Sequence, residues 1–552
     1  MISMPVIKSV ASPEIVEAIQ KIEDRADKCY ESLELLNLHP SVALRALMVH
    51  GIGTIEAKID QRGNNSPELT ATLINMSRSI PIAMNWAARH GNVSASPAAG
   101  TWTVDLTITA RQALDIATRY AHFVSCLPMW HKDRYLADLV SPELVRFTAP
   151  GTARNRQVSA HLKDMRPKTG RFQMHRTPTP ATMPEINKAL FQIAFDGARR
   201  TGPFSFEYVD PKVLWSELLP QYQAIASGIA RRSDDLLLGN YTLGEFNQIY
   251  GAFFSICAAH EHLCFAWGRS YGYPFESAVM VRSSENWVSI LSELSGIAPE
   301  KCLRIVSDLT FALGRSIDLH VHPFVPLEDG PGRTLAVAPH FPLHSRPDEN
   351  ILRVVSILRP AFFNQTSSGK ESESLSELKK RLPSRSLKGP ISMPKPIPDI
   401  DMLTADEGSS TVILAELKWM RKSLRPVEII EKDAAVLDGV SQLQEIRAFL
   451  THHPDHLTGL GRLPRRLQDY DHVYWLVVAR DHWLWMDVAD GIALVEFEAF
   501  AMAMGGADDL RSAVEQLLTY DWLPVEGRDF RVQYDGVTVN GVGQESEVFY
   551  SL

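Results

Sequence analysis

The spacing of apolar residues changes near residue 364, and this change limits the chain to folds with at least two parts. Before it, apolar residues recur at mixed intervals of three and four, which predicts helices. After it, short apolar runs alternate with one longer helical stretch, which predicts an α/β module. We therefore expect a multi-domain protein, with a mainly helical recognition or regulatory region over residues 1–363 and an α/β domain over residues 364–552 that ends in a strand-rich extension. In the second domain, extended segments are predicted over residues 397–405, 410–419, 472–479 and 483–487, and a late hairpin over residues 530–549 is predicted to turn at Asp535-Gly536.

The first region has helix-start signals and one long irregular stretch. Residues typical of helix starts stand at Ser12, Thr109, Thr182, Ser216, Thr242, Ser284 and Asp348. Residues 149–181 are rich in Thr, Pro and Arg and have few apolar anchors. Two helical subdomains with a break near residues 150–180 are therefore the alternative to a single helical region.

Length and cysteine content predict a cytoplasmic protein. With 552 residues, 45% of them hydrophobic, the chain can bury more than one core. Its five cysteines are odd in number and widely spaced, which argues against a disulfide framework. The first eleven residues lack the apolar core of a secretory signal. Residues 249–267 include His260, Glu261 and His262, so this apolar stretch predicts a buried helix and no membrane contact.

Residues 398–418 combine two short apolar strands with four charged side chains. Because strand side chains alternate between faces, Asp399 and Asp401 share one side of the first strand, and Glu416 and Lys418 share one side of the second. Carboxylates among Ile, Leu and Val are costly to bury unless a cation or a proton neutralises them. A hairpin would therefore build a Mg²⁺ or Mn²⁺ site from Asp401 and Glu416, with Asp399 as a further candidate ligand.

Such a site suits the hydrolysis of a phosphodiester. This reaction needs a hard cation to offset the developing charge and a positioned water molecule. Lys418 is placed to orient or deprotonate that water, or to steady the phosphate.

Pro398-Asp399 and Glu416-Leu417-Lys418 resemble the motif of the PD-(D/E)xK superfamily of restriction-endonuclease-like nucleases. The resemblance covers residues 372–494, and Ile400-Asp401-Met402 matches an apolar-Asp-apolar pattern common on the family's first acidic strand. It implies an α-β-β-β-α-β core and a metal-dependent nuclease, with DNA as the favoured substrate and bacterial antiviral defence as an associated role. Only two of the three strands before the second helix are evident, so we expect another within residues 385–393.

The resemblance also implies two further site residues. Family members often carry a Glu on the helix before the first strand, and Glu377 is the preferred candidate here for a further metal ligand. Many carry a Gln on the helix after the lysine strand, where Gln442 and Gln444 stand, with Gln442 assigned to the catalytic set.

A nuclease needs a positively charged surface to bind nucleic acid. Because the net charge of the chain is −9, such a surface has to come from local clusters of basic residues. The candidate nucleic-acid-binding residues are Lys380, Arg381, Arg385, Arg421, Lys422, Arg465 and Arg466. A further basic stretch runs from Arg154 to Arg176. The alternative for each cluster is a solvated face.

Two rival functions follow from the same sequence. One is a nucleic-acid-binding or scaffolding protein that keeps the nuclease fold without cutting. The other is a metal hydrolase built on His320 and His322, which would face the same way on a strand over residues 317–323. The helical region is expected to recognise a partner protein or to form a homo-oligomer, and endo- and exonucleolytic action both stay open.

Overall fold

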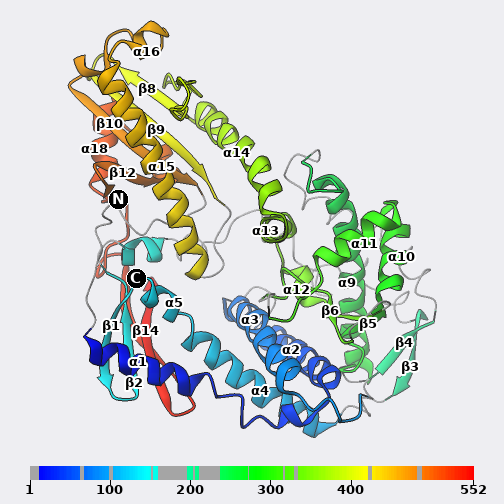
Figure 1. The fold of residues 1–552 in the computed structure, drawn as a ribbon. Coiled ribbons are helices and arrows are strands. Elements are labelled where there is room, and N and C mark those ends of the chain that lie inside the picture. The colour runs from blue at the N-terminus through cyan, green and yellow to red at the C-terminus, as the bar shows by residue number, and fades with distance from the viewer. Residues whose placement is uncertain are drawn as a thin grey trace. The chain divides into compact units, whose positions relative to one another are not determined.

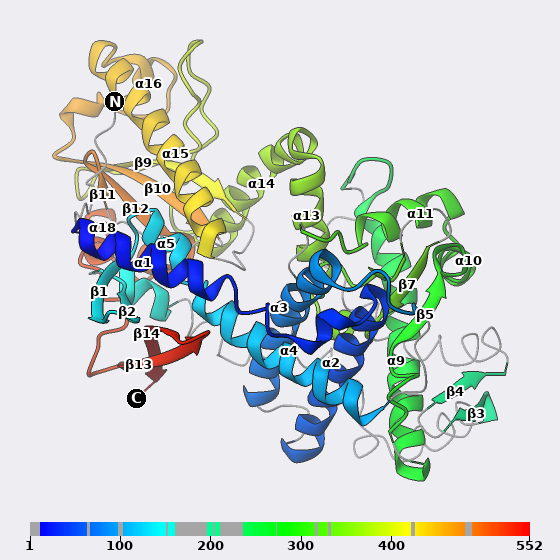
Figure 2. The ribbon, with the colours of Figure 1, turned by 60° about the horizontal axis from the view of Figure 1, so that its bottom comes forward.

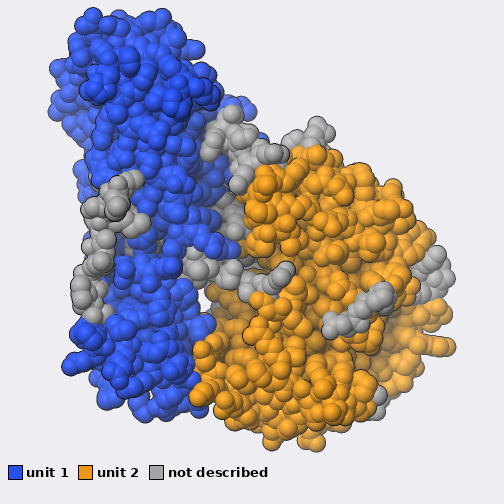
Figure 3. Space-filling view, in the orientation of Figure 1, with its two compact units in different colours: residues 1–25, 123–166, 364–552 blue, residues 26–122, 167–363 orange. Residues whose placement is uncertain are grey.

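The computed structural model describes residues 12–62, 67–97, 103–150, 153–159, 196–202, 205–209, 236–271, 273–314, 318–328, 333–420, 426–480 and 488–551. The chain divides into two compact units (Figure 3): unit 1 contains residues 1–25, 123–166 and 364–552, and unit 2 contains residues 26–122 and 167–363. One division falls at residue 364, as expected. The expected region 1–363 is nevertheless not one body, because the chain leaves unit 2 at residue 123 and re-enters it after residue 166, within the predicted break.

Unit 2 is mainly helical. Its first part contains η1 (Glu34–Asn37), α2 (Pro40–Arg62), α3 (Pro67–His90) and α4 (Val104–Phe123). Its second part contains α9 (Leu243–Tyr271), α10 (Ser284–Ser295), α11 (Pro299–Asp308), α12 (His340–Leu343) and α13 (Pro347–Leu358). Two small sheets accompany them, β3 (Ala198–Gly202) with β4 (Ser205–Tyr208), and β5 (Met280–Ser283), β7 (Thr334–Val337) and β6 (Val325–Pro326) in that order.

Of the predicted helix starts that the structure describes, Ser12 caps α1 (Pro13–Ala26) and Thr242 caps α9, whereas α10 is capped by Ser283 and α13 has no side-chain cap. Thr242 and Glu245 cap α9 reciprocally, with Thr242 N–H donating to Glu245 Oε2 at 2.9 Å and Glu245 N–H to Thr242 Oγ1 at 3.2 Å. The predicted start at Thr109 is wrong, because Thr103 is the cap: its Oγ1 accepts the N–H of Leu106 at 3.2 Å. Thr182 and Ser216 lie outside the described residues.

The apolar stretch 249–267 lies within α9, where residues 252–260 are all buried, so the prediction of a buried helix is confirmed. Among the helices that the structure describes, none is both long and apolar enough to cross a membrane. All five cysteines are buried free thiols.

Unit 1 is built on a five-stranded sheet in the order β11 (Val488–Ala489), β12 (Ile492–Glu496), β10 (His472–Arg480), β9 (Thr411–Trp419) and β8 (Met402–Asp406). β8 and β9 form an antiparallel hairpin, whereas β9, β10 and β12 run parallel. The helix α15 (Pro426–His452) carries the chain from β9 to β10, since parallel neighbours require a crossover connection.

Helices cover both faces of this sheet (Figure 1). On one face, α14 (Pro360–Arg381), α17 (Phe497–Gly506) and α18 (Leu510–Leu518) pack on a core that includes Ile413 and Ala415. On the other face, α15 packs on a core that includes Leu403, Val412 and Leu414. Residues 411–417 are all buried, which explains the nearly continuous apolar run of β9.

A short edge segment pairs with the outer side of β8. Lys388 and Ile391 form antiparallel bridges with Leu403 and Ile400, and these bridges lie within residues 385–393, where a further strand is expected. Gly389 has a φ of 143°, and a Cβ on it would lie 2.1 Å from the carbonyl oxygen of Asp401. Only glycine therefore allows this segment to approach the backbone of Asp401 so closely.

The first predicted strand is shorter than expected. Residues 397–405 are predicted to be extended, but β8 begins at Met402, and Pro398-Asp399 lies in the connection before it. The strand predicted over residues 483–487 lies outside the described residues, and β12 is not predicted from the sequence.

A four-stranded sheet completes unit 1 in the order β1 (Leu136–Ser141), β2 (Leu144–Thr148), β14 (Val542–Ser551) and β13 (Phe530–Val539) (Figure 2). The predicted C-terminal hairpin is confirmed, but its predicted turn at Asp535-Gly536 is wrong, because both residues lie inside β13. The chain turns at Asn540-Gly541, whose φ angles of 48° and 77° are the positive values that a type I′ turn requires.

The side chain of Arg156 links residues 153–159 to the five-stranded sheet. It is 0% exposed, its Nη2 donates to the carbonyl of Leu494 at 3.5 Å, and its Nη1 lies 3.7 Å from Glu496 Oε1. Its guanidinium also lies over the rings of Tyr520 and Trp522, at 5.1 and 5.6 Å from their centroids. An arginine of the predicted basic stretch is therefore a buried structural residue.

Candidate active site

The acidic residues predicted on neighbouring strands come together at the end of the β8–β9 hairpin that lies away from its turn. The ladder pairs Met402 with Ala415, so Asp401 lies opposite Glu416 one step further along. Asp401 is two residues from Leu403 and Glu416 two residues from Leu414, both of which belong to the core under α15. Strand alternation therefore directs both carboxyl groups toward α15.

Lys418 connects this acidic pair to α15. Its Nζ donates to Glu416 Oε1 at 2.7 Å and to Gln442 Oε1 at 2.9 Å, and the side chains of Lys418 and Glu416 are only 15% and 6% exposed. Gln442 thus lies where the sequence predicts the glutamine of the site. Gln444 donates instead to Asp490 Oδ2 at 3.0 Å.

The carboxyl group of Asp401 is held at the same place. Its Oδ2 accepts the N–H of Leu417 at 2.8 Å. Burial raises the pKa of Asp401 above its ordinary value, although the Leu417 N–H, the charge of Lys418 and a hydrogen bond with Glu416 act in the opposite direction. Two adjacent, largely buried carboxyl groups need a cation or a proton to neutralise them.

The donor set fits a hard divalent ion. Mg²⁺ and Mn²⁺ prefer carboxylate oxygens, and one or two carboxylates suffice when water and phosphate complete the shell. Asp401 and Glu416 supply two such groups from opposite positions at one end of the β8–β9 hairpin. Lys418 adds a positive group beside them that can face a phosphate.

Gly439 provides the space that this network occupies beneath α15. A Cβ at this position would lie 3.0 Å from Lys418 Cε, 3.3 Å from Glu416 Cγ and 3.4 Å from Val477 Cγ1. The first two distances are tighter than ordinary van der Waals contact, so a methyl group would press on both charged side chains.

We expect Gly439→Ala to lower the rate of metal-dependent cleavage about tenfold, because a small displacement of the reacting groups slows the reaction strongly. Helix propensity favours alanine by about 1 kcal/mol, which offsets the crowding, so the melting temperature should change little. Gly506→Ala in α17 is the matched control, because a Cβ there meets nothing within 4 Å. Equal cleavage rates for the two variants would contradict this role of Gly439.

The other two predicted metal ligands have different partners. Asp399 is exposed, and its Oδ1 accepts the N–H of Met393 at 3.0 Å, so it closes the turn before β8. Glu377 lies on α14, which covers the opposite face of the sheet, and it pairs with Arg480 at 2.7 Å and with Arg381 at 3.6 Å. The structure therefore unites Asp401 and Glu416 and places Asp399 and Glu377 in other contacts.

Two of the predicted nucleic-acid-binding arginines near α14 serve the fold. Arg381 binds Glu498 with two hydrogen bonds of 3.1 and 2.9 Å. Arg385 donates to the carbonyls of Met504, Ala507 and Asp508, which satisfies the end of α17. Lys380 is exposed on α14, and Arg421 and Lys422 lie outside the described residues.

Arg465 and Arg466 lie at the wrong end of the sheet to touch a phosphate at Glu416. Arg465 pairs with Glu407 at 3.3 Å and donates to Ser410 Oγ at 2.8 Å, so it fixes the β8–β9 turn. Arg466 pairs with Asp455 at 2.6 Å. The turn and Glu416 stand at opposite ends of the hairpin, about 17 Å apart along β9. Spacing along the sequence could not show this.

The predicted metal strand at His320 and His322 is wrong. Residues 319–321 form a turn, in which Asp318 Oδ1 accepts the backbone N–H of His320 at 2.8 Å and lies 3.1 Å from His320 Nδ1. Burial lowers the pKa of His322 to about 4. The two histidines therefore do not lie on one side of a strand. The structure thus gives no support to a metal hydrolase built on His320 and His322.

Sequence reasoning missed a second group of side chains that could hold a metal ion, which lies in unit 2 and consists of Glu56, Glu261 and His340. Glu261 was visible as a charge within an apolar helix, and that was its only signal. The sequence gives no signal that Glu56 and His340 lie beside Glu261, because these two residues are 284 residues apart in the chain.

Comparison with protein-family models, with curated proteins and with solved structures finds no match.

Proposed function

We propose that unit 1 is a metal-dependent nuclease that hydrolyses phosphodiester bonds, with DNA as the favoured substrate. The observation that carries the proposal is the network of Asp401, Glu416, Lys418 and Gln442, which joins two acids and an amine from adjacent strands to one helix. A structural role alone would not require four polar groups where Ile, Leu and Val surround them.

We further propose that the α/β part of unit 1 has the restriction-endonuclease-like fold that its motif resembles. The order along the chain is α14, the edge segment at 388–391, β8, β9, α15 and β10. This order agrees with the α-β-β-β-α-β succession that the resemblance implies. Asp401 directly precedes the second of these strands, and Glu416 lies on the third.

The residues have separate tasks in the proposed reaction. Asp401 and Glu416 would hold Mg²⁺ or Mn²⁺, which when bound offsets the negative charge that develops on the phosphate. Lys418 donates two hydrogen bonds through its ammonium group, so we assign it to stabilising that charge and to orienting the attacking water. Gln442 positions Lys418. Water forms the new bond to phosphorus, the ester bond breaks, and the departing oxygen takes up a proton.

Cleavage assays on the full chain test this proposal. The protein is incubated with supercoiled plasmid, linear duplex, single-stranded DNA and RNA, each with Mg²⁺, Mn²⁺ or EDTA. We expect cleavage of DNA with either metal and none with EDTA. Asp401→Asn should abolish it, whereas Asp399→Asn should retain most of it, because the asparagine oxygen can still accept the N–H of Met393.

Other outcomes have definite meanings. If the protein binds DNA but shows no metal-dependent cleavage, the result would indicate a nucleic-acid-binding protein with a nuclease-like fold in place of an enzyme. Cleavage that survives Asp401→Asn but not Asp399→Asn would move the metal ligand to Asp399. We propose that unit 2 supplies recognition of substrate, partner protein or a second copy of the chain, and a role in antiviral defence would follow only from the family resemblance.

A further inference from the structure

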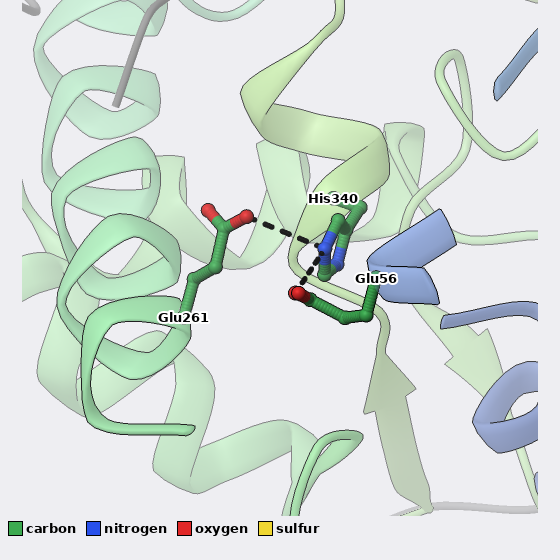
Figure 4. Close-up of side chains that lie close together, drawn as sticks. All are labelled: Glu56, Glu261 and His340. Atoms are coloured by element: carbon green, nitrogen blue, oxygen red, sulfur yellow. Dashed lines mark hydrogen bonds and ion pairs between the residues drawn. The ribbon is translucent and has the colours of Figure 1, made fainter. Parts of the chain in front are cut away.

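Three acidic and basic side chains from distant parts of unit 2 meet at one point (Figure 4). Glu56 extends from α2, Glu261 from α9 and His340 from the start of α12. His340 Nε2 lies 2.7 Å from Glu56 Oε1 and 3.3 Å from Glu261 Oε1. One potential ligand atom from each residue lies within 4.8 Å of the other two.

The group is buried and its hydrogen bonding is incomplete. The side chains of His340, Glu56 and Glu261 are 2%, 11% and 12% exposed. Glu261 Oε2 and His340 Nδ1 are buried without a hydrogen-bond partner among the residues that the structure describes. A buried carboxylate oxygen without a donor is costly, and Glu261 Oε2 belongs to the same carboxyl group whose Oε1 faces His340. A cation beside this carboxyl group would offset that cost.

Charge favours a divalent cation as that partner. Two carboxyl groups face one imidazole, so when both are ionised even a protonated His340 leaves one negative charge in excess. A dication with a neutral imidazole balances both carboxylates. The buried thiols of Cys257 and Cys264 on the same helix stay neutral, because burial raises the pKa of each well above its ordinary value, so they add no further negative charge.

We propose that Glu56, Glu261 and His340 bind a transition-metal dication, with Zn²⁺ favoured over Mg²⁺. A tetrahedral ion with ligands at about 2.0–2.1 Å places them about 3.3 Å from one another. The Glu261–His340 separation of 3.3 Å already has this value, and the Glu56–His340 hydrogen bond of 2.7 Å must open slightly. An imidazole nitrogen among the ligands selects Zn²⁺, since Mg²⁺ prefers an all-oxygen shell.

The burial of this site indicates a structural ion. Bound there, it joins α2, α9 and α12, whose ligands are up to 284 residues apart. The site belongs to unit 2, whereas the nuclease network belongs to unit 1. The inference therefore does not rest on the proposed function.

Metal content measures the proposal directly. The untagged full chain is stripped with EDTA, equilibrated with ZnCl₂ or MgCl₂, gel-filtered and analysed by mass spectrometry for bound metal. The variants are Glu261→Gln and His340→Gln, and the control is His452→Gln, an exposed histidine on α15. We expect the parent and the control to retain one Zn²⁺ more than the two variants, whose affinity for that ion falls at least about 100-fold. Glu416→Gln should keep this ion, because Glu416 belongs to the network in unit 1.

Thermal unfolding supplies a second measurement. Zn²⁺ should raise the melting temperature of the parent and the control, and should not raise that of Glu261→Gln, which preserves the shape of the side chain. Circular dichroism in EDTA identifies any variant that fails to fold. Equal Zn²⁺ content in the parent and in a folded Glu261→Gln, no Zn²⁺ in the parent, or equal occupancy by Mg²⁺ would each overturn the proposal.

Discussion

Glu416→Gln is expected to lower the rate of metal-dependent DNA cleavage by about 100- to 1,000-fold. The substitution keeps the size of the side chain and one acceptor for Lys418, but it removes a charge that neutralises the ion. The loss should therefore appear in kcat at saturating Mg²⁺, and the Mg²⁺ concentration for half-maximal rate should rise. A rate within threefold of the parent would remove Glu416 from the site.

Lys418→Met should cause a loss of similar size, because the ammonium group is the positive partner of Glu416 and Gln442. When two groups act together, removing the second has little further effect once the first is gone. The Glu416→Gln/Lys418→Met double variant should therefore cleave DNA only slightly more slowly than either single variant. Glu445→Gln is the matched control, since Glu445 is exposed on α15. Additive losses would indicate two independent roles, and near-ultraviolet circular dichroism checks that each variant is folded.

Arg156→Met is expected to destabilise unit 1 by about 3–5 kcal/mol, because it leaves Glu496 as a buried charge without this partner. The guanidinium also loses its positions over Tyr520 and Trp522. The two units need not unfold in the same step. The free energy of unfolding of unit 1 is therefore measured separately, by following amide hydrogen exchange in β12 as the urea concentration rises.

Two further variants make this test specific. Arg511→Met removes an exposed pair with Glu515 and should cost at most about 1 kcal/mol. The Arg156→Met/Glu496→Gln double variant removes both charges and should regain part of the lost stability. A single-variant cost below about 1 kcal/mol would show that Arg156 fills space without bearing an energetically important charge.

The local parts of the candidate site could be predicted from the sequence. An apolar run before Glu416 and alternation of faces are enough to place Glu416 and Lys418 on one side of a strand, which is where β9 has them. Gln442 could be placed because α15 follows β9 directly. Asp399 and Asp401 could not be separated by alternation alone, since the distinction depends on where β8 begins.

The parts that depend on long-range contacts could not be predicted. Arg385 has the composition of a phosphate-binding residue, but it satisfies the carbonyls at the end of α17, more than a hundred residues later. Arg156 belongs to the core of a unit whose largest part begins only at residue 364. Basic clusters read from a sequence therefore overstate the surface available for nucleic acid, because arginine is also the side chain best suited to buried carbonyls and carboxylates.

The pairing of β14 with β2 delays the completion of the proposed enzyme during synthesis. β2 ends at Thr148, and its parallel neighbour spans residues 542–551, so the ribosome must make almost four hundred residues, including much of unit 2, before the ladder can close. Domains that are contiguous in sequence fold as they emerge, whereas this one must wait for its last strand. If unit 1 is the nuclease proposed above, a cell would thus meet the assembled enzyme only after unit 2 has had time to fold.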